Sequence, residues 1–288
     1  EIHAPAGVVE RDLTLLGLVA LWDPPRPDVA EAVSLCRRAG IHVVVMTGDY
    51  GLTASALAAR IGLPITQIVT GEEVDRLGPD TLRELALTPG VLFARVSPAH
   101  KLAVVRALRA ADIVVAVTGD GVNDAPALKA ADIGVAMGLR GSEVAKEAAE
   151  MVITDDHFAS IVSAVRLGRS IWSNVGRFVT YVFASNVAEL VPFLALVFVG
   201  VPLPLTVMQV LAVDLGTDLL PALALGAEPP EPGLMDVPPR PRTERLLSLR
   251  RLAHAYGFLG VIEASLAMLA FFATYWMEGW RPGEPMAA

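Results

Sequence analysis

Hydrophobic positions follow two different patterns along the chain. In the first half, short apolar runs alternate with amphipathic segments. The apolar runs predict strands over residues 13–21, 41–46, 91–96, 113–117, 133–137 and 151–153. The amphipathic segments predict helices over residues 27–39, 52–61, 98–109, 123–130 and 143–149. Regular alternation of strands with helices favours an α/β domain built on a parallel, doubly wound sheet.

The second half contains long apolar runs instead. Each run exceeds the roughly 20 residues that an α-helix needs to cross a bilayer, and the runs occupy residues 178–200, 205–227 and 252–277. Few helix breakers occur between residues 157 and 178, so the first run is expected to continue upstream as a stalk helix over 157–177. The whole chain is therefore predicted to be an α/β domain followed by an all-α transmembrane bundle.

Arginines predict how the bundle is oriented. The connection 228–251 contains five arginines, whereas the connection 201–204 has no charged residue. The positive-inside rule places the arginine-rich connection in the cytoplasm, and Arg166, Arg169 and Arg177 before the first run agree with this. We therefore expect a multi-pass protein of the cell membrane whose soluble domain is cytoplasmic.

Composition narrows the possible partners. The chain has 288 residues, of which 53% are hydrophobic, more than is usual for a soluble domain. Its net charge of −8 argues against a nucleic-acid partner. The single cysteine, Cys36, excludes an internal disulfide and leaves no thiolate in the membrane runs for a soft metal. The chain begins at Glu1 without a signal-peptide pattern, and we expect it to be part of a longer protein.

Residues 117–126 read Val-Thr-Gly-Asp-Gly-Val-Asn-Asp-Ala-Pro and directly follow an apolar run. Asp120 and Asp124 thus lie just past the carboxyl end of a predicted strand, where open α/β sheets bind ligands. Two carboxylates beside a glycine turn suit a hard cation such as Mg²⁺. The alternative is a turn that only caps a helix. A second strand end, Met46-Thr47-Gly48-Asp49, repeats the pattern and favours a site.

Four motifs in this order resemble signatures of the P-type cation-transporting ATPases, between about residue 13 and about residue 248. They read Asp23-Pro24-Pro25-Arg26, Met46-Thr47-Gly48-Asp49, Phe93-Ala94-Arg95-Val96-Ser97-Pro98-Ala99-His100-Lys101 and Thr118-Gly119-Asp120-Gly121-Val122-Asn123-Asp124-Ala125-Pro126. The resemblance implies a haloacid-dehalogenase-like phosphorylation domain. The implied boundaries are 1–12 for the end of a nucleotide-binding domain, 13–156 for the phosphorylation domain, 157–177 for the stalk and 178–277 for the transmembrane helices.

The resemblance also implies roles around the third and fourth motifs. Asp120 is expected to bind Mg²⁺, and Asn123 and Asp124 are expected to orient the phosphate site. Lys101 would neutralise charge on the transferred phosphoryl group. Taken alone, Lys101 fits a solvated lysine in the first turn of a helix better, and only the surrounding motif favours a functional role.

At the second motif, the resemblance implies that Thr47 and Gly48 donate hydrogen bonds to the phosphoryl group. Asp49 and Arg95 are expected to lie near the nucleotide, so ATP and Mg²⁺ are the implied cofactors. The family's nucleophilic aspartate belongs to an Asp-Lys-Thr-Gly motif, which this sequence lacks. We expect that aspartate to lie upstream in the same polypeptide.

Carboxylates within the apolar runs indicate a second site. A charge at bilayer depth costs about 3 kcal/mol even on lenient scales, so each needs a partner or a function. Asp214, Thr217 and Asp218 share one helical face, and Asn186 and Glu189 are three residues apart on the preceding run. Together they offer an oxygen cage for a hard cation. Glu263 on the third run is equally compatible with a ligand and with a packing contact.

Which cation the cage binds stays open. The stretch Asp214-Leu215-Gly216-Thr217-Asp218 resembles sodium/potassium and proton/potassium pumps, whereas calcium pumps commonly carry Asn where Asp214 stands. Protonation can cancel a buried carboxylate, so Ca²⁺, Na⁺, K⁺ and H⁺ are all compatible. The alternative to an ion site is a set of hydrogen bonds between protonated acids.

The predicted function is part of an ATP-driven cation pump that forms an aspartyl-phosphate intermediate. Its expected partners are the cation, ATP, the bilayer and the rest of the same polypeptide, and the 288 residues alone are expected to be inactive. Two alternatives are a membrane-tethered phosphatase of the haloacid-dehalogenase superfamily and a non-catalytic, pump-like regulatory subunit.

Overall fold

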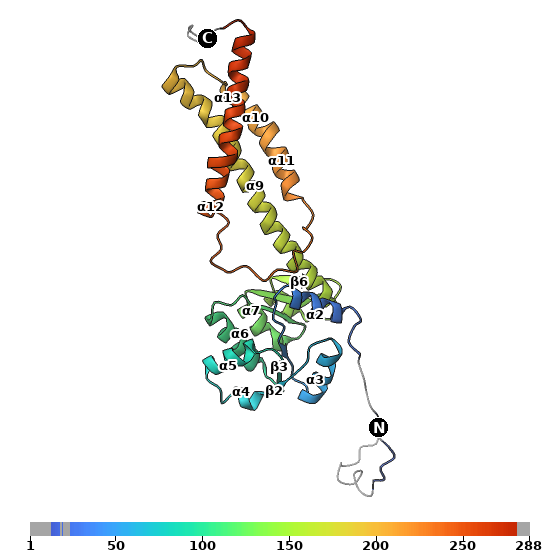
Figure 1. Ribbon diagram of the computed structural model, residues 1–288. Coiled ribbons are helices and arrows are strands. Elements are labelled where there is room, and N and C mark those ends of the chain that lie inside the picture. The colour runs from blue at the N-terminus through green and yellow to red at the C-terminus, as the bar shows by residue number, and fades with distance from the viewer. Residues whose placement is uncertain (1–12, 18, 20–23, 281–288) are drawn as a thin grey trace.

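The chain forms a soluble domain and a helical bundle, which one long helix joins (Figure 1). The structure is a computed structural model that describes residues 13–17, 19 and 24–280. The joining helix, α9 (Phe158–Val199), begins against the soluble domain and continues through the bundle. The expected end of a nucleotide-binding domain, residues 1–12, lies outside the described residues, as does Asp23 of the first motif.

Two parallel three-stranded sheets form the centre of the soluble domain. The strand orders are β1 (Val45–Met46), β3 (Val91–Ala94), β2 (Gln67–Thr70) and β4 (Ala116–Gly119), β5 (Ile133–Met137), β6 (Met151–Ile153). Phe93 in the middle strand of the first sheet pairs with Met46 on one side and Val69 on the other. Phe93 and Val117 of β4 belong to one buried cluster, so a single core serves both sheets. The predicted parallel α/β domain is confirmed.

Eight short helices connect and cover the strands that the structure describes. They are α2 (Val29–Arg38), α3 (Gly51–Arg60), α4 (Gly71–Val74), α5 (Pro79–Leu87), α6 (Pro98–Ala110), η1 (Val122–Asp124), α7 (Ala125–Ala130) and α8 (Glu143–Ala148). The start of α6 shows how sequence sets such boundaries. The Ser97 hydroxyl accepts the His100 N–H, and Pro98 occupies the first turn, where it removes no helical bond. The helix then buries Val104, Val105 and Leu108.

One expected strand is wrong. The described residues of 13–21 have no regular structure, and Leu13, Leu15 and Leu16 are exposed. An apolar run becomes a strand only where a neighbouring strand pairs with its backbone N–H and C=O groups. The strands expected over 41–46 and 113–117 are also short or shifted, because only Val45–Met46 and Ala116–Gly119 pair with neighbours.

β2, α4 and α5 were not predicted, although the sequence contains signals for them. Thr70 and Glu73 form a reciprocal capping box at the start of α4. Pro79 stands in the first turn of α5, which buries Leu82 and Ala86 at helical spacing. These caps identify the two helices better than the weak hydrophobic pattern between residues 62 and 90.

The membrane part contains three helical segments whose length and composition allow them to cross a bilayer: Phe158–Val199, Val207–Gly226 and Leu249–Met277. The predicted continuous helix through the stalk is confirmed by α9, which ends at Gly200 in the left-handed conformation (φ 76°). The second segment consists of α10 (Val207–Val213), the π-helical turn η2 (Asp214–Asp218) and α11 (Leu219–Gly226). The third consists of α12 (Leu249–Leu252), the π-helical segment η3 (Ala253–Leu259) and α13 (Gly260–Met277).

The connection 228–251 runs from α11 back to the soluble domain before it returns to α12 (Figure 1). Arg169 of α9 holds it, because its guanidinium donates to the carbonyl oxygens of Leu234 (3.0 Å) and Val237 (2.8 Å). The same guanidinium donates to the Ala39 carbonyl at the end of α2 (2.8 Å). Arg169 therefore ties the stalk, the connection and the soluble domain together.

A second tie joins the same connection to the second sheet. Arg242 donates to Asp132 over 2.7 Å, and Asp132 also accepts the Val115 N–H over 2.9 Å. Burial opposes ionisation of Asp132, but these two hydrogen bonds and the charges of Arg109 and Arg242 outweigh it and lower the pKa of Asp132. The aspartate is thus held ionised between strand β4 and the connection.

The first motif contacts the start of the stalk. Arg26 donates to the Asp156 carbonyl over 3.0 Å. Asp28 follows Arg26 by two positions, and its Oδ2 lies 2.8 Å from Nδ1 of His157. This hydrogen bond lowers the pKa of Asp28. Arg26 therefore ties the first motif to the residues directly before α9.

Candidate functional site

The carboxyl end of β4 forms a tight turn around one carboxylate. Asp124 Oδ1 lies 2.7 Å from Lys101 Nζ. Asp124 Oδ2 accepts the backbone N–H groups of Asp120 (3.3 Å) and Gly121 (3.2 Å). A side chain at Gly119 would place its Cβ 2.4 Å from the Asp124 Cβ, so only glycine lets the carboxylate fold back under the turn. The fold therefore brings together Lys101 of α6 and Asp124 of η1, which are 23 residues apart in the sequence.

Both members of this pair are largely shielded from water. The side chains of Lys101 and Asp124 are 19% and 13% exposed. An ion pair that is removed from water in this way is held more firmly than a surface pair. The lysine ammonium is consequently fixed beside the turn, with two further N–H groups available to an anionic ligand.

Asp120 and Asn123 stand on the solvent side of the same turn, and both are exposed. The carboxylate of Asp120 makes no hydrogen bond or ion pair with any described residue, whereas its carbonyl accepts the Ser142 N–H over 2.8 Å. An exposed carboxylate oxygen beside a fixed ammonium fits a Mg²⁺ ligand that shares the ion with phosphate oxygens. Asp124 uses both oxygens within the turn and therefore positions the site.

The carboxyl end of β1 forms a second polar turn. The Thr47 hydroxyl donates to Asp49 Oδ2 (3.2 Å) and accepts the Asp49 N–H (3.1 Å). The backbone of Arg95 donates to the Asp49 carbonyl over 3.2 Å, and Arg95 itself adopts a left-handed conformation (φ 53°). Gly48, Asp49 and Arg95 are exposed. The structure groups these residues together, and among the described residues no hydrogen bond or ion pair links them to the Asp120 turn.

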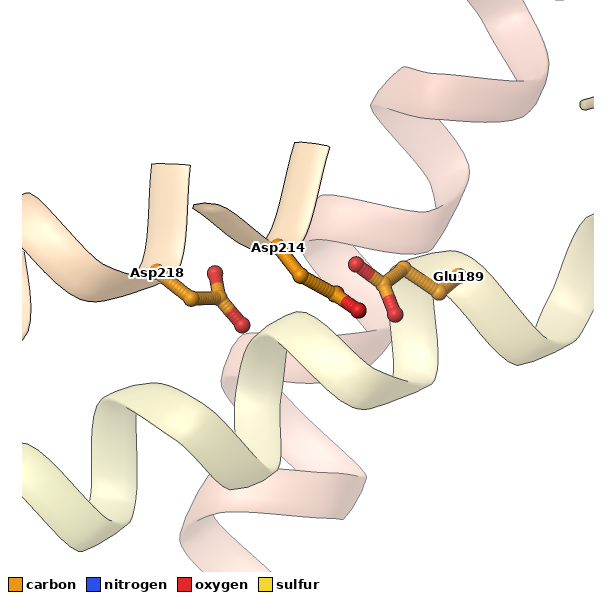
Figure 2. Close-up of side chains that lie close together, drawn as sticks. All are labelled: Glu189, Asp214 and Asp218. Atoms are coloured by element: carbon orange, nitrogen blue, oxygen red, sulfur yellow. The ribbon is translucent and has the colours of Figure 1, made fainter. Parts of the chain in front are cut away.

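Three carboxylates meet inside the bundle. Glu189 of α9 and Asp214 and Asp218 of η2 each offer an oxygen, and these oxygens lie within 4.8 Å of one another (Figure 2). Oε1 of Glu189 is buried without a hydrogen-bond partner among the described residues. Three anionic groups at this spacing repel one another unless a cation or protons join them. The arrangement fits a hard cation with oxygen ligands.

Proline explains why the second helix opens at this point. Pro221 has no N–H, so the Thr217 carbonyl loses its usual helical partner. The Tyr181 hydroxyl of α9 donates to that carbonyl over 2.5 Å instead. The Thr217 hydroxyl bonds to the Val213 carbonyl over 2.7 Å, and η2 takes the wider π-helical form. The wider turn of η2 directs the side chains of Asp214 and Asp218 toward α9 (Figure 2).

Of the two adjacent residues Ser185 and Asn186, the structure brings Ser185 to the cage and not the predicted ligand Asn186. Asn186 is exposed, whereas Ser185 is buried and donates to Asp218 Oδ1 over 2.8 Å. Tyr181, Ser185 and Glu189 are spaced four residues apart, so they share one face of α9. That spacing would have identified both Ser185 and Tyr181. Glu263 of α13 lies near enough to Asp218 for their charges to interact.

Comparison with known proteins finds similarity in both the soluble domain and the bundle. A model described as "Cation transporting ATPase, C-terminus" matches residues 202–287, and models of haloacid dehalogenase-like hydrolases match residues 2–132 and 101–165. The potassium-transporting ATPase alpha chain 2 of Oryctolagus cuniculus is 41% identical over 94% of this chain and 27% of its own length. The sodium/potassium-transporting ATPase subunit alpha-4 of Homo sapiens is 41% identical over 94% of this chain and 29% of its own length.

By sequence, this chain belongs to the P-type cation-transporting ATPases. It spans less than a third of the length of the relatives named above. The similarity to these relatives extends over 94% of the chain and therefore covers the soluble domain and the bundle together. The predicted haloacid-dehalogenase-like domain and the membrane helices of this P-type ATPase chain are confirmed.

Proposed function

We propose that the protein containing this chain is an ATP-driven cation pump, in which the soluble domain handles an aspartyl phosphate and the bundle binds the transported cation. One observation carries the proposal: a shielded Lys101–Asp124 pair at a strand end and a three-carboxylate cage between membrane-length helices occur in the same chain. A phosphatase alone would not need carboxylates at bilayer depth, where each charge is costly. The names of the relatives support transport of a cation.

The residues of the soluble domain would act on the phosphoryl group by position and charge. Lys101 places its ammonium against the developing negative charge, and Asp124 keeps it there. Asp120 would hold Mg²⁺, which offsets the charge of the phosphoryl oxygens when it is bound. Thr47 and Gly48 would donate to the same oxygens, while Asp49 and Arg95 would lie near the nucleotide. The attacking aspartate would come from a part of the polypeptide outside these 288 residues.

The cage would bind the transported cation through Glu189, Asp214 and Asp218, with Thr217 and Asn186 as further candidate ligands. Ser185 keeps one oxygen of Asp218 in place. Three carboxylates give the cage a formal charge of −3, which suits either more than one monovalent cation or one divalent cation with a proton. The relatives named for potassium and sodium favour a monovalent cation, and calcium stays as the second candidate.

α9 would couple the two sites mechanically. At about 1.5 Å per residue, its 42 residues form a rod of about 63 Å. Its first turns are fixed to the sheet, because Ile161 packs with Val135 of β5 and Ile153 of β6 in one buried cluster. β5 pairs directly with β4, which carries Asp120 at its end. A shift of the second sheet on phosphorylation would therefore move Glu189 at the other end of the same helix.

The test measures ATP hydrolysis by the natural full-length protein in membranes at fixed Mg²⁺, titrated separately with Ca²⁺, Na⁺, K⁺ and Mn²⁺. Stimulation by one cation, lost in Asp218→Asn, is expected and would identify the cargo. Hydrolysis that no cation stimulates would remove the basis for a pump. Turnover of simple phosphate esters without any cation response would favour the phosphatase alternative.

A further inference from the structure

A crevice of about 620 Å³ opens between α9, α11 and α13, at the end of the bundle where the connection 228–251 leaves and returns. Its wall on α9 extends from Ser173 to Ala184. The eleven steps from Ser173 to Ala184, at about 1.5 Å each, correspond to a depth of about 16 Å. That is close to half of the roughly 30 Å hydrocarbon core, so the crevice is as deep as a single lipid leaflet.

The mouth of the crevice is basic and its walls are apolar. Arg177 of α9, Arg240 of the connection and Arg251 of α12 come together at the mouth from three different elements. Deeper positions are lined mainly by aliphatic side chains, among them Ile262 and Leu266 of α13. A positively charged rim above an apolar slot complements a molecule with an anionic head and a hydrocarbon chain.

The three arginines differ in whether a nearby carboxylate neutralises the guanidinium charge. Arg177 forms ion pairs with Glu228 and Glu231, which neutralise it. Arg251 donates to a backbone carbonyl, that of Leu246, and keeps its charge. The guanidinium of Arg240 lies 5.8 Å above the Trp172 ring, and its nearest acid, Glu244, is 4.0 Å away on an exposed side chain.

We propose that this crevice binds one anionic phospholipid from the leaflet on the side of the connection, with its phosphate between Arg240 and Arg251. Guanidinium groups bind phosphate through paired N–H donors, and each keeps donors free for this. An acyl chain would lie along Ile262 and Leu266. Glu263, on the same wall below the mouth, repels a second anion and so keeps the phosphate at the rim. The same positive rim disfavours this crevice as an entry route for cations.

The test uses the natural full-length protein, purified in detergent and titrated with dioleoylphosphatidylglycerol or dioleoylphosphatidylcholine while bound lipid is counted by native mass spectrometry. The wild-type protein is expected to retain one phosphatidylglycerol in preference to phosphatidylcholine. The double variant Arg240→Gln/Arg251→Gln is expected to bind phosphatidylglycerol roughly 30-fold more weakly, since two basic groups leave the headgroup.

A matched control lies in the same segment. Arg245→Gln/Arg250→Gln removes the same charge from two exposed arginines that do not line the crevice, and it is expected to keep wild-type affinity. Ile262→Trp fills the slot, leaves every arginine in place and is expected to weaken binding roughly 10-fold. If the arginine double variant does not fold, Ile262→Trp still tests whether phosphatidylglycerol binds in the crevice.

Four results would overturn the proposal. Equal losses in the two arginine double variants would mean diffuse attraction to a basic surface. Equal retention of phosphatidylcholine and phosphatidylglycerol, or no retained lipid in the wild-type protein, would mean that the crevice selects no anionic lipid. Displacement of phosphatidylglycerol by millimolar inorganic phosphate would identify a site for a free anion instead.

Discussion

Arg169 holds the connection 228–251 against the stalk, and Arg169→Ala tests that arrangement quantitatively. Two of its three hydrogen bonds, to the carbonyls of Leu234 and Val237, belong to the connection. A hydrogen bond from a charged donor contributes about 1.5–3 kcal/mol when buried, and we reduce this to about 1 kcal/mol each for a half-buried arginine. Loss of both lowers the free energy of opening the connection by about 2 kcal/mol, which raises the open population roughly 30-fold.

Limited trypsin digestion measures that population, because the connection contains potential cleavage sites at Arg242 and Arg245, whereas Pro241 blocks cleavage after Arg240. When reclosing is faster than cleavage, the cleavage rate follows the open population. Peptides ending at Arg242 or Arg245 are therefore expected to appear roughly 30-fold faster from Arg169→Ala than from the wild-type protein. Arg166→Ala is the matched control, because Arg166 is exposed on the same helix without a hydrogen bond or ion pair to described residues. Unchanged cleavage in Arg169→Ala, or an equal increase in Arg166→Ala, would refute the reasoning.

Three further outcomes are expected. Lys101→Met should lower ATP turnover at least 100-fold, since a fixed cation beside transferred charge is worth about 3 kcal/mol, and wild-type turnover would contradict the role of the Lys101–Asp124 pair. Asp120→Asn should raise the Mg²⁺ concentration needed for half-maximal phosphorylation about 10-fold or more, which a Mg²⁺ titration would show. Asp132→Ala should increase hydrogen exchange of the Val115 N–H, directly before β4, at pH 7, because this group loses its acceptor at a cost of about 2 kcal/mol. Since the folded pKa of Asp132 is lowered, its contribution is present above the unfolded value of 3.8 and is lost as the pH falls through the folded value, so the difference from wild type should shrink in acid.

Local sequence signals located most of the elements and the polar turn of the soluble domain. The apolar run before Asp120 predicts a strand, and β4 ends directly before that residue. The expectation that this strand is buried holds for one face only, because Val115 and Val117 are buried whereas Val114 is exposed. Spacing alone brought Asp214 and Asp218 to one helical face, and the carboxylates converge with Glu189 in the structure. Such predictions succeed where the residues of a site lie on one helix or strand, because the periodicity of that element then sets their relative positions.

Other features depend on partners that local sequence does not reveal. Leu13, Leu15 and Leu16 have the composition of a strand but no pairing neighbour, so they form none in the described structure. Ser185 and Asn186 are adjacent, and the choice between them depends on how α9 is rotated against η2. The ties from Arg169 and Arg242 to distant segments likewise arise from tertiary packing.

The most direct test of the coupled-pump account compares wild-type protein and Asp218→Asn, reconstituted full-length in vesicles, for cation uptake and phosphorylation from ATP in the same preparation. Asp218 belongs to the cage inside the bundle, whereas the phosphate site lies in the soluble domain. The account predicts that the variant loses ATP-driven cation uptake and, with it, the cation dependence of the acyl phosphate. Cation uptake at the wild-type rate in Asp218→Asn, with an unchanged cation requirement for phosphorylation, would contradict it.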